Sequence, residues 1–352
     1  MADRGWDLLL IYGHTWRKDF FRYLVNVNLS GPHMAAAVTA AGEVRLLVSD
    51  PWDTEAASTS GQAATIYEPD FAEGLKRLTA GQERAVVAIA GMEPMQARFV
   101  HAVCSATGKS PVSATLAVEE LRRVKDPDEI ETLKRAAILS DRGYQRFAEV
   151  IEIGMAEYEL AAEVEAFLKS NGAEDNFMLI GSGGVEVTGM KPPTGRRFKP
   201  GDSVITELTP QLDGYWAQIC RTLVLGEPDA KQLESFAIFA EARQAAEDLI
   251  APGVDIAEVA RAQNDVFRRH GFGEYTGPKY TRVRGHNLGL HPDENPYILE
   301  DVHCELKEGM VVIAHPNTYL PLSGYMVFGD SLLVTAGGCT SLNTTERKLF
   351  QK

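Results

Sequence analysis

The stretch from residue 121 to residue 154 has the clearest helical pattern in the chain and constrains the fold most. Asp126 precedes Pro127, with Glu129 three residues after the Asp. This order is typical of a capped helix start, because the Asp oxygen accepts from free N–H groups and Pro fits the first helical position. Apolar residues then recur at helical spacing: Ile130, Leu133, Ala137, Tyr144, Phe147 and Ile151. A long amphipathic helix is therefore predicted.

A domain boundary is predicted just before this helix, which gives domains 1–122 and 123–352. The first domain alternates apolar, strand-like segments with helical ones, a pattern typical of a small α/β domain. The second has a further helix at 157–170, then helices at 231–250 and 255–270, with blocks of strands between the pairs. This alternation predicts an α+β domain of duplicated halves around one sheet.

Composition excludes several classes of partner. The chain has 352 residues and is 45% hydrophobic, which suits a globular protein with a large core. A net charge of −14 argues against nucleic acid or an anionic membrane surface as partner. Four scattered cysteines without a CxxC pair fit a reducing compartment, and no apolar run is long enough for a membrane span or signal peptide. We therefore expect a cytoplasmic protein without membrane or nucleic-acid partners.

The segment Ser203–Thr222 is predicted to form two strands joined by a turn, with polar residues where a packed strand should be apolar. Glu207 interrupts an apolar run, and Gln218 and Cys220 are two residues apart, so they share a face of the second strand. A buried carboxylate needs a partner or a function, which makes this segment a candidate site. The alternative is an edge strand with its polar face in water.

Seven segments of the chain, in order and spacing, resemble the pita-bread superfamily of prolidases, aminopeptidase P, methionine aminopeptidases, creatinase and ectoine hydrolase. They are LRRVKDPDEIETLKRAA, GMAEYELAAEVEAFLKSNGA, RRFKPGDSVI, LDGYWAQICRTLVLGEP, RGHNLGL, ENPYIL and LKEGMVVIAHP. The resemblance implies a curved antiparallel sheet with pseudo-twofold halves. The N-terminal segment RYLVNVNLS resembles the prolidase and creatinase branch, which implies a homodimer.

Peptidases that this chain resembles bind two divalent metal ions through two Asp, one His and two Glu. The resemblance places these five ligand positions, in chain order, at Glu207, Gln218, His286, His315 and Gly329. A neutral Gln and a Gly cannot replace bridging carboxylates, so a dinuclear metal centre is not expected, and the prediction is an enzyme without a cofactor.

Loss of the metal ligands resembles creatinase and its relatives, which hydrolyse small non-peptide C–N bonds. The leading hypothesis is therefore a non-peptidase hydrolase of a small, anionic, amide-type or amidine-type compound. His286 and His315 would be the general acid and base, and Glu207 would orient or activate water.

Further residues are candidates for this site. Cys220 is a possible nucleophile if a His lies within reach, and otherwise a small buried apolar residue. Asp293 falls where the family has a second His, although HPDENP could be only a turn. The candidate substrate-binding residues are Gln218, Lys191, Arg282, Arg284, His14 and Trp16. The basic ones are anion anchors or solvated loop residues, and by resemblance His14 and Trp16 could cap the partner's site.

Two other functions remain open. Glu207, His286 and His315 are the ligand set of a mononuclear Fe, Zn or Mn site. The chain could also be a catalytically inert binding module, as in the pita-bread domains of histone chaperones, although it has no acidic tail.

Overall fold

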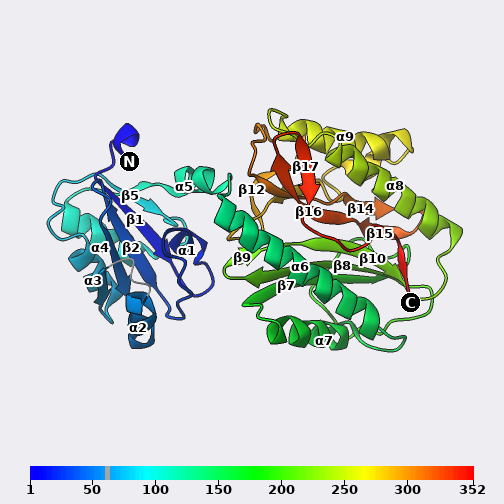
Figure 1. Cartoon of the computed structure of the whole chain (residues 1–352), viewed down its shortest axis with the longest axis horizontal. Helices are drawn as coiled ribbons and strands as arrows, with labels where there is room; N and C mark the ends of the chain where they lie inside the picture. Colours follow the sequence, from blue (N-terminus) through cyan, green and yellow to red (C-terminus); the bar gives the residue numbers. More distant parts are fainter. Residues whose placement is uncertain (60–63) are drawn as a thin grey trace. The chain divides into compact units, whose positions relative to one another are not determined.

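The computed structural model describes residues 1–59 and 64–352, which divide into two compact units, Met1–Arg122 and Arg123–Lys352 (Figure 1). The first unit has a six-stranded sheet in the order β4-β3-β2-β1-β5-β6. Its elements are η1 Ala2–Arg4, β1 Leu8–Gly13, α1 Asp19–Val25, β2 Met34–Thr39, β3 Val44–Val48, α2 Pro51–Thr59, β4 Ala64–Tyr67, α3 Phe71–Leu78, β5 Val87–Ala90, α4 Ala97–Thr107, β6 Val112–Ser113 and α5 Thr115–Arg122.

Both faces of this first sheet are buried. Leu10 of β1 packs with Leu75 of α3 and Phe99 of α4, whereas the next residue, Ile11, packs on the other face with Phe21 of α1. Successive side chains of a strand point to opposite faces, so a sheet covered on both sides requires the near-continuous apolar run found in β1.

The second unit contains a ten-stranded sheet whose main path is β12-β11-β13-β16-β10-β8-β7, and a separate β14-β15 hairpin. Strands β9, β17 and β18 pair with β8, β16 and β10. The elements are α6 Pro127–Val150, α7 Glu157–Ser170, β7 Asp175–Gly183, β8 Ser203–Leu212, β9 Tyr215–Trp216, β10 Ile219–Val224, α8 Ala230–Glu247, α9 Ile256–Arg269, η2 Gly273–Thr276, β11 Gly285–Asn287, β12 Glu294–Tyr297, β13 Val311–Ala314, β14 Asn317–Leu320, β15 Gly324–Val327, β16 Gly329–Thr335, β17 Gly338–Ser341 and β18 Phe350–Gln351.

The predicted capping of the long helix is confirmed. The Asp126 side chain accepts from the backbone N–H groups of Asp128 and Glu129, and the Glu129 side chain accepts from the N–H of Asp126. These bonds satisfy donors that have no partner within the helix, so the chain turns into α6 at the position the sequence indicates.

Two helix pairs cover different parts of the same sheet. Apolar residues of α6 and α7 pack against Val204 and Leu208 of β8, and those of α8 and α9 pack against Val312 and Ala314 of β13 (Figure 1). This arrangement confirms the predicted fold class, an α/β domain followed by duplicated helix-and-strand halves. It leaves the residues between these positions, including Glu207, on the opposite face. Within the described ranges, no helix combines the length and apolar composition of a membrane span.

Candidate functional site

Strand register brings four candidate positions into one row across the sheet. Glu207 of β8 pairs directly with Cys220 of β10, and Cys220 pairs with Gly329 of β16. His315, which follows β13, continues the row, because a Cβ atom added at Gly329 would lie 2.5 Å from its Cβ. Cross-strand partners point to the same face, so residues far apart in sequence meet on the face that the helices leave uncovered.

Glu207 is the titratable group at one end of this row. Its side chain keeps some accessible surface but is enclosed by protein, and burial raises its pKa to about 7. The negative charge of Asp293 raises the pKa further. A carboxyl group with a pKa near neutrality can both hold and release a proton under physiological conditions.

We expect Glu207→Gln to increase the free energy of unfolding above pH 7 relative to wild type. The folded-state pKa of about 7 lies above the unfolded value near 4.5, so the folded protein binds more protons between those values, and wild-type stability falls as pH rises through that window. The variant lacks this ionisation. Its free energy of unfolding relative to that of the wild type should therefore rise by about 2–3 kcal/mol between pH 4.5 and pH 8. Urea unfolding across this range measures the difference. Glu308→Gln, at an exposed position, controls for the amide substitution itself, and a pH-independent offset for Glu207→Gln would contradict the raised pKa.

His286 lies beside the row on β11. It pairs with Ile313, two residues before His315, and the two imidazole rings lie 5.3 Å apart, nearly perpendicular. Its Nδ1 is 3.0 Å from the carbonyl oxygen of Asn287 and 3.7 Å from the Asp293 carboxylate. Burial lowers the pKa of His286. The neutral ring donates its Nδ1 proton to the carbonyl, so Nε2 carries the free lone pair.

His315 is buried, and burial lowers its pKa to about 3, helped by neighbouring His286. It therefore stays neutral at physiological pH. Its Nδ1 is bonded to Asn317, while its buried Nε2 has no hydrogen-bond partner among the described residues. A buried polar atom without a partner is uncommon, and this nitrogen is available to hydrogen-bond a water or a ligand.

Cys220 is enclosed completely, and burial raises the pKa of its thiol, with the charge of Glu207 adding to the effect. The thiol therefore stays protonated, which does not favour a thiolate nucleophile. Gln218 donates from its side-chain amide to Cys220 Sγ at 3.4 Å, and its backbone N–H donates to the Ser331 hydroxyl. Both side chains serve packing and hydrogen bonding in this row.

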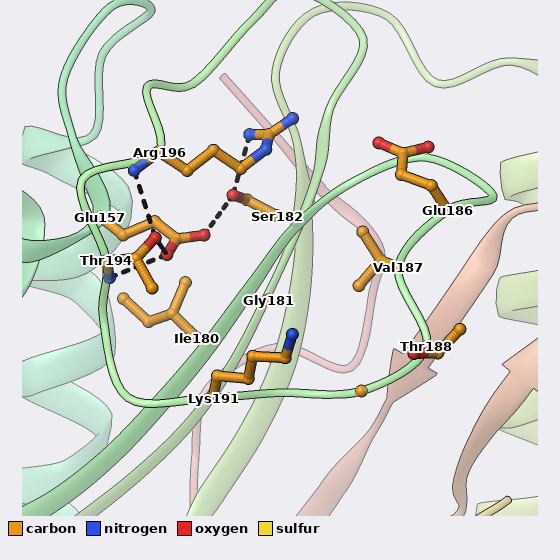
Figure 2. Close-up of a pocket in the computed structure, with 11 residues that line it drawn as sticks. Glu157, Ile180, Gly181, Ser182, Glu186, Val187, Thr188, Lys191, Thr194 and Arg196 are labelled. Atoms are coloured by element: carbon orange, nitrogen blue, oxygen red, sulfur yellow. Dashed lines mark hydrogen bonds between the residues drawn. The ribbon is translucent and has the colours of Figure 1, made fainter.

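The candidate anion anchors do not converge on these residues. Lys191 lines a cavity of about 250 Å³ next to β7 with Ser182, Thr188 and Arg196, and its ammonium group points into it (Figure 2). Neither Glu207 nor the two histidines line this cavity.

The two loop arginines have different environments. Arg282 pairs with exposed Asp301 at 2.6 Å, whereas Arg284 is completely buried and reaches Asn317, the neighbour of His315. His14 and Trp16 belong to the N-terminal unit, where Trp16 is 89% exposed.

Two further residues lie near the row, and no pattern in the sequence around them marks them as residues of the site. Asn317 contacts His315, and Tyr325 packs with Cys220. Burial raises the pKa of the Tyr325 phenol, and the charge of Glu207 adds to this. They lie on the β14-β15 hairpin, and a hairpin's position over a sheet depends on tertiary packing rather than on the hairpin sequence.

The five positions that the resemblance aligns with metal ligands do not fit a two-metal centre. Gly329 supplies no ligand atom, and a Cβ there would lie 2.5 Å from the Cβ of His315 and 2.6 Å from the carbonyl oxygen of Ala314. Among residues 1–59 and 64–352, no three His, Cys, Asp or Glu side chains are grouped so that they could hold a metal ion. The mononuclear set of Glu207, His286 and His315 is therefore not supported either.

The chain is similar to proteins that are named as peptidases, both in sequence and in structure. The model of the family described as metallopeptidase family M24 matches residues 131–336. The chain is 32% identical over 235 residues to the Xaa-Pro dipeptidase of Pyrococcus furiosus, an alignment that spans 66% of each protein. It is 30% identical over 351 residues to the probable dipeptidase PepE of Mycobacterium tuberculosis, covering 98% of this chain and 90% of that protein. The solved prolidase of Pyrococcus horikoshii OT3 is similar with a TM-score of 0.88 and 25% identity, over 99% of this chain and 97% of that one.

These relatives correct two predictions. They are named as dipeptidases and a prolidase, so the prediction of a hydrolase for non-peptide C–N compounds is wrong, and the likeness to creatinase is not supported. The prediction of an enzyme that uses no cofactor, or at most one metal ion, is wrong at the level of the family, which is described as metallopeptidases. The predicted pita-bread fold is confirmed by the solved prolidase. Because the family model matches more than half of its length, the chain belongs to metallopeptidase family M24.

Proposed function

We propose that the chain is a hydrolase of short peptides, with Xaa-Pro dipeptides as the substrate class. The relatives named as Xaa-Pro dipeptidase, dipeptidase and prolidase support this class. The observation that carries the proposal for this chain is the row of Glu207 and His315, with His286 beside it, on the face of the sheet that no helix covers.

The side chains of this row supply proton transfer and hydrogen bonding. Glu207, with a pKa of about 7, can accept a proton from an attacking water and pass it to the departing amine. His286 offers a lone pair at Nε2, which can hold that water in place. The exposed Asp293 carboxylate, 3.7 Å from His286, adds negative charge that keeps Glu207 basic.

Hydrolysis of Ala-Pro and Leu-Pro, measured with Mn²⁺, Co²⁺ or Zn²⁺ supplied and with chelator, tests this proposal. We expect turnover of at least one dipeptide under one of these conditions. We expect Glu207→Ala to lower kcat by about 10²- to 10⁴-fold, the range for loss of a general acid–base group. Exposed Glu308→Gln is the control that should retain turnover. Absence of hydrolysis under every metal condition would reject the proposed function.

We also propose a homodimer of two-domain chains in a cytoplasmic setting, with domains 1–122 and 123–352. The segment of His14 and Trp16 is the candidate partner contact, since Trp16 is 89% exposed and aromatic side chains are enriched at protein interfaces. A monomeric mass in solution would contradict the dimer.

A further inference from the structure

A buried arginine lies behind the candidate site and is held by oxygen acceptors that carry no charge. Arg284 donates to the Asn264 side chain at 2.7 Å, to the Thr281 carbonyl at 2.7 Å and to the Asn317 backbone carbonyl at 2.8 Å. It also donates to the Asn317 side-chain oxygen at 3.2 Å. The side chain is completely buried, so this guanidinium group is fixed in place.

The guanidinium group determines which way the Asn317 amide points. A guanidinium group only donates hydrogen bonds, so the atom of Asn317 facing Arg284 must be its oxygen. The amide nitrogen, Nδ2, then faces Nδ1 of His315 at 3.1 Å. The opposite orientation would place two donors together at Arg284, which rules out an amide flip.

This orientation in turn fixes the tautomer of His315. Nδ2 of Asn317 donates, so Nδ1 of His315 must accept and carries no proton. A neutral imidazole then has its proton on Nε2. That nitrogen is buried and has no partner among the described residues. A buried N–H group without an acceptor is unfavourable, and a ligand oxygen that reached it would supply the missing acceptor.

We propose that Arg284 and Asn317 are positioning residues that hold His315 in the Nε2–H tautomer, so that His315 donates a hydrogen bond to the carbonyl oxygen of the substrate. The substrate part of this inference rests on the proposed peptidase function. The carbonyl oxygen gains negative charge as the amide is attacked, and a fixed donor at that oxygen stabilises the transition state. The resemblance aligns this position with a carboxylate metal ligand. A ring whose Nε2 carries a proton offers no lone pair there, so His315 acts as a donor and not as a metal ligand.

The tautomer can be measured without any substrate. Imidazole nitrogen NMR of the ¹⁵N-labelled full-length chain distinguishes protonated from unprotonated ring nitrogens, and His315→Gln identifies the signals. We expect wild-type His315 to be protonated at Nε2 and bare at Nδ1. In Asn317→Asp, the new carboxylate accepts from Nδ1, so we expect the proton at Nδ1. This variant should fold, because the carboxylate also lies against the Arg284 guanidinium. Exposed His303 is the internal control. A proton at Nδ1 of wild-type His315 would overturn the proposal.

Turnover of Ala-Pro tests the role toward substrate. We expect His315→Ala to lower kcat by about 10- to 10³-fold, as for loss of a hydrogen-bond donor to the developing oxyanion. His315→Gln, which keeps an N–H group, should recover at least tenfold of that loss. Asn317→Asp should lower kcat more than it raises KM. Equal turnover by all three variants and wild type would reject the donor role. If the wild type showed the expected tautomer but no turnover, the peptidase function would be rejected. The role of Arg284 and Asn317 in holding the His315 tautomer would still be supported.

Discussion

Gly329→Glu, which places a carboxylate at the position that the resemblance aligns with the last family ligand, is expected to destabilise the protein severely and not to create a metal site. A Cβ at this position would lie 2.5 Å from the Cβ of His315, 2.8 Å from its Cα and 2.6 Å from the Ala314 carbonyl oxygen. Two of these atoms belong to the backbone of a neighbouring strand, so they cannot move without breaking sheet hydrogen bonds. Forcing extra atoms into a packed core typically destabilises by about 1–3 kcal/mol, and a clash with backbone should exceed about 3 kcal/mol.

Thermal and urea unfolding of Gly329→Glu and Gly329→Ala measure this effect, and the Ala variant separates the clash of Cβ from the charge. Gly337→Glu is the matched control, because a Cβ at this exposed position on β16–β17 meets no atom within 4 Å. We expect the control to unfold like wild type. If Gly329→Glu had wild-type stability and bound Zn²⁺ or Mn²⁺, the strands that carry Gly329 and His315 would have to move apart to admit the side chain. The site could then accommodate a two-metal centre.

Asp330→Ala is expected to lower the free energy of unfolding by about 3–5 kcal/mol, the range measured when one partner of a buried ion pair is removed. Asp330 is buried and pairs with Arg221 and with Arg243 of α8, each at 2.6 Å. Without the carboxylate, the buried Arg221 guanidinium would lose the carboxylate it pairs with, and Arg243 would keep only Glu247, at 2.8 Å. Net stability is usually about 5–15 kcal/mol, so this loss would be a large fraction of it.

Asp301→Ala is the matched control, because the Arg282–Asp301 pair has the same 2.6 Å distance but both side chains are exposed. Surface ion pairs contribute little, so its unfolding midpoint should stay near that of wild type. Asp330 follows Gly329 on β16. Asp330→Ala should therefore also make the positions of the side chains in the row less fixed and lower turnover. Similar stability losses in the two variants would show that burial does not decide the strength of the Asp330 pairs.

Most of the helices and strands could be predicted from the sequence, because helix caps, turns and apolar spacing depend on residues that are close together in the chain. The Asp-Pro start of α6 is formed by hydrogen bonds within four residues. The hairpin around Glu207 follows from two apolar runs separated by a turn, and the structure forms it as β8, β9 and β10. The helix at Thr115–Arg122 was not predicted, because an eight-residue helix leaves too short a pattern to recognise.

Motif matching named the residues of the candidate site but not their contacts. Glu207, His286 and His315 were found by their alignment with ligand positions, and the structure places them on one face of the sheet. Lys191, taken as an anion anchor from its charge, lines a different cavity. The sequence could not show which cavity the Lys191 side chain enters, because successive residues of an extended loop can point to different sides of a sheet.

The sequence alone indicated the family, through seven segments that resemble it, and the order of the elements, through local composition and spacing. Only the tertiary structure decided which side chains meet at the positions that the resemblance aligns with family ligands. The pairing of four strands places His315 against Gly329, and the hairpin that follows brings Asn317 between His315 and Arg284. These contacts join residues by register and packing, which no single segment encodes, so the hydrogen-bonding state of His315 could be inferred only after the sheet was assembled.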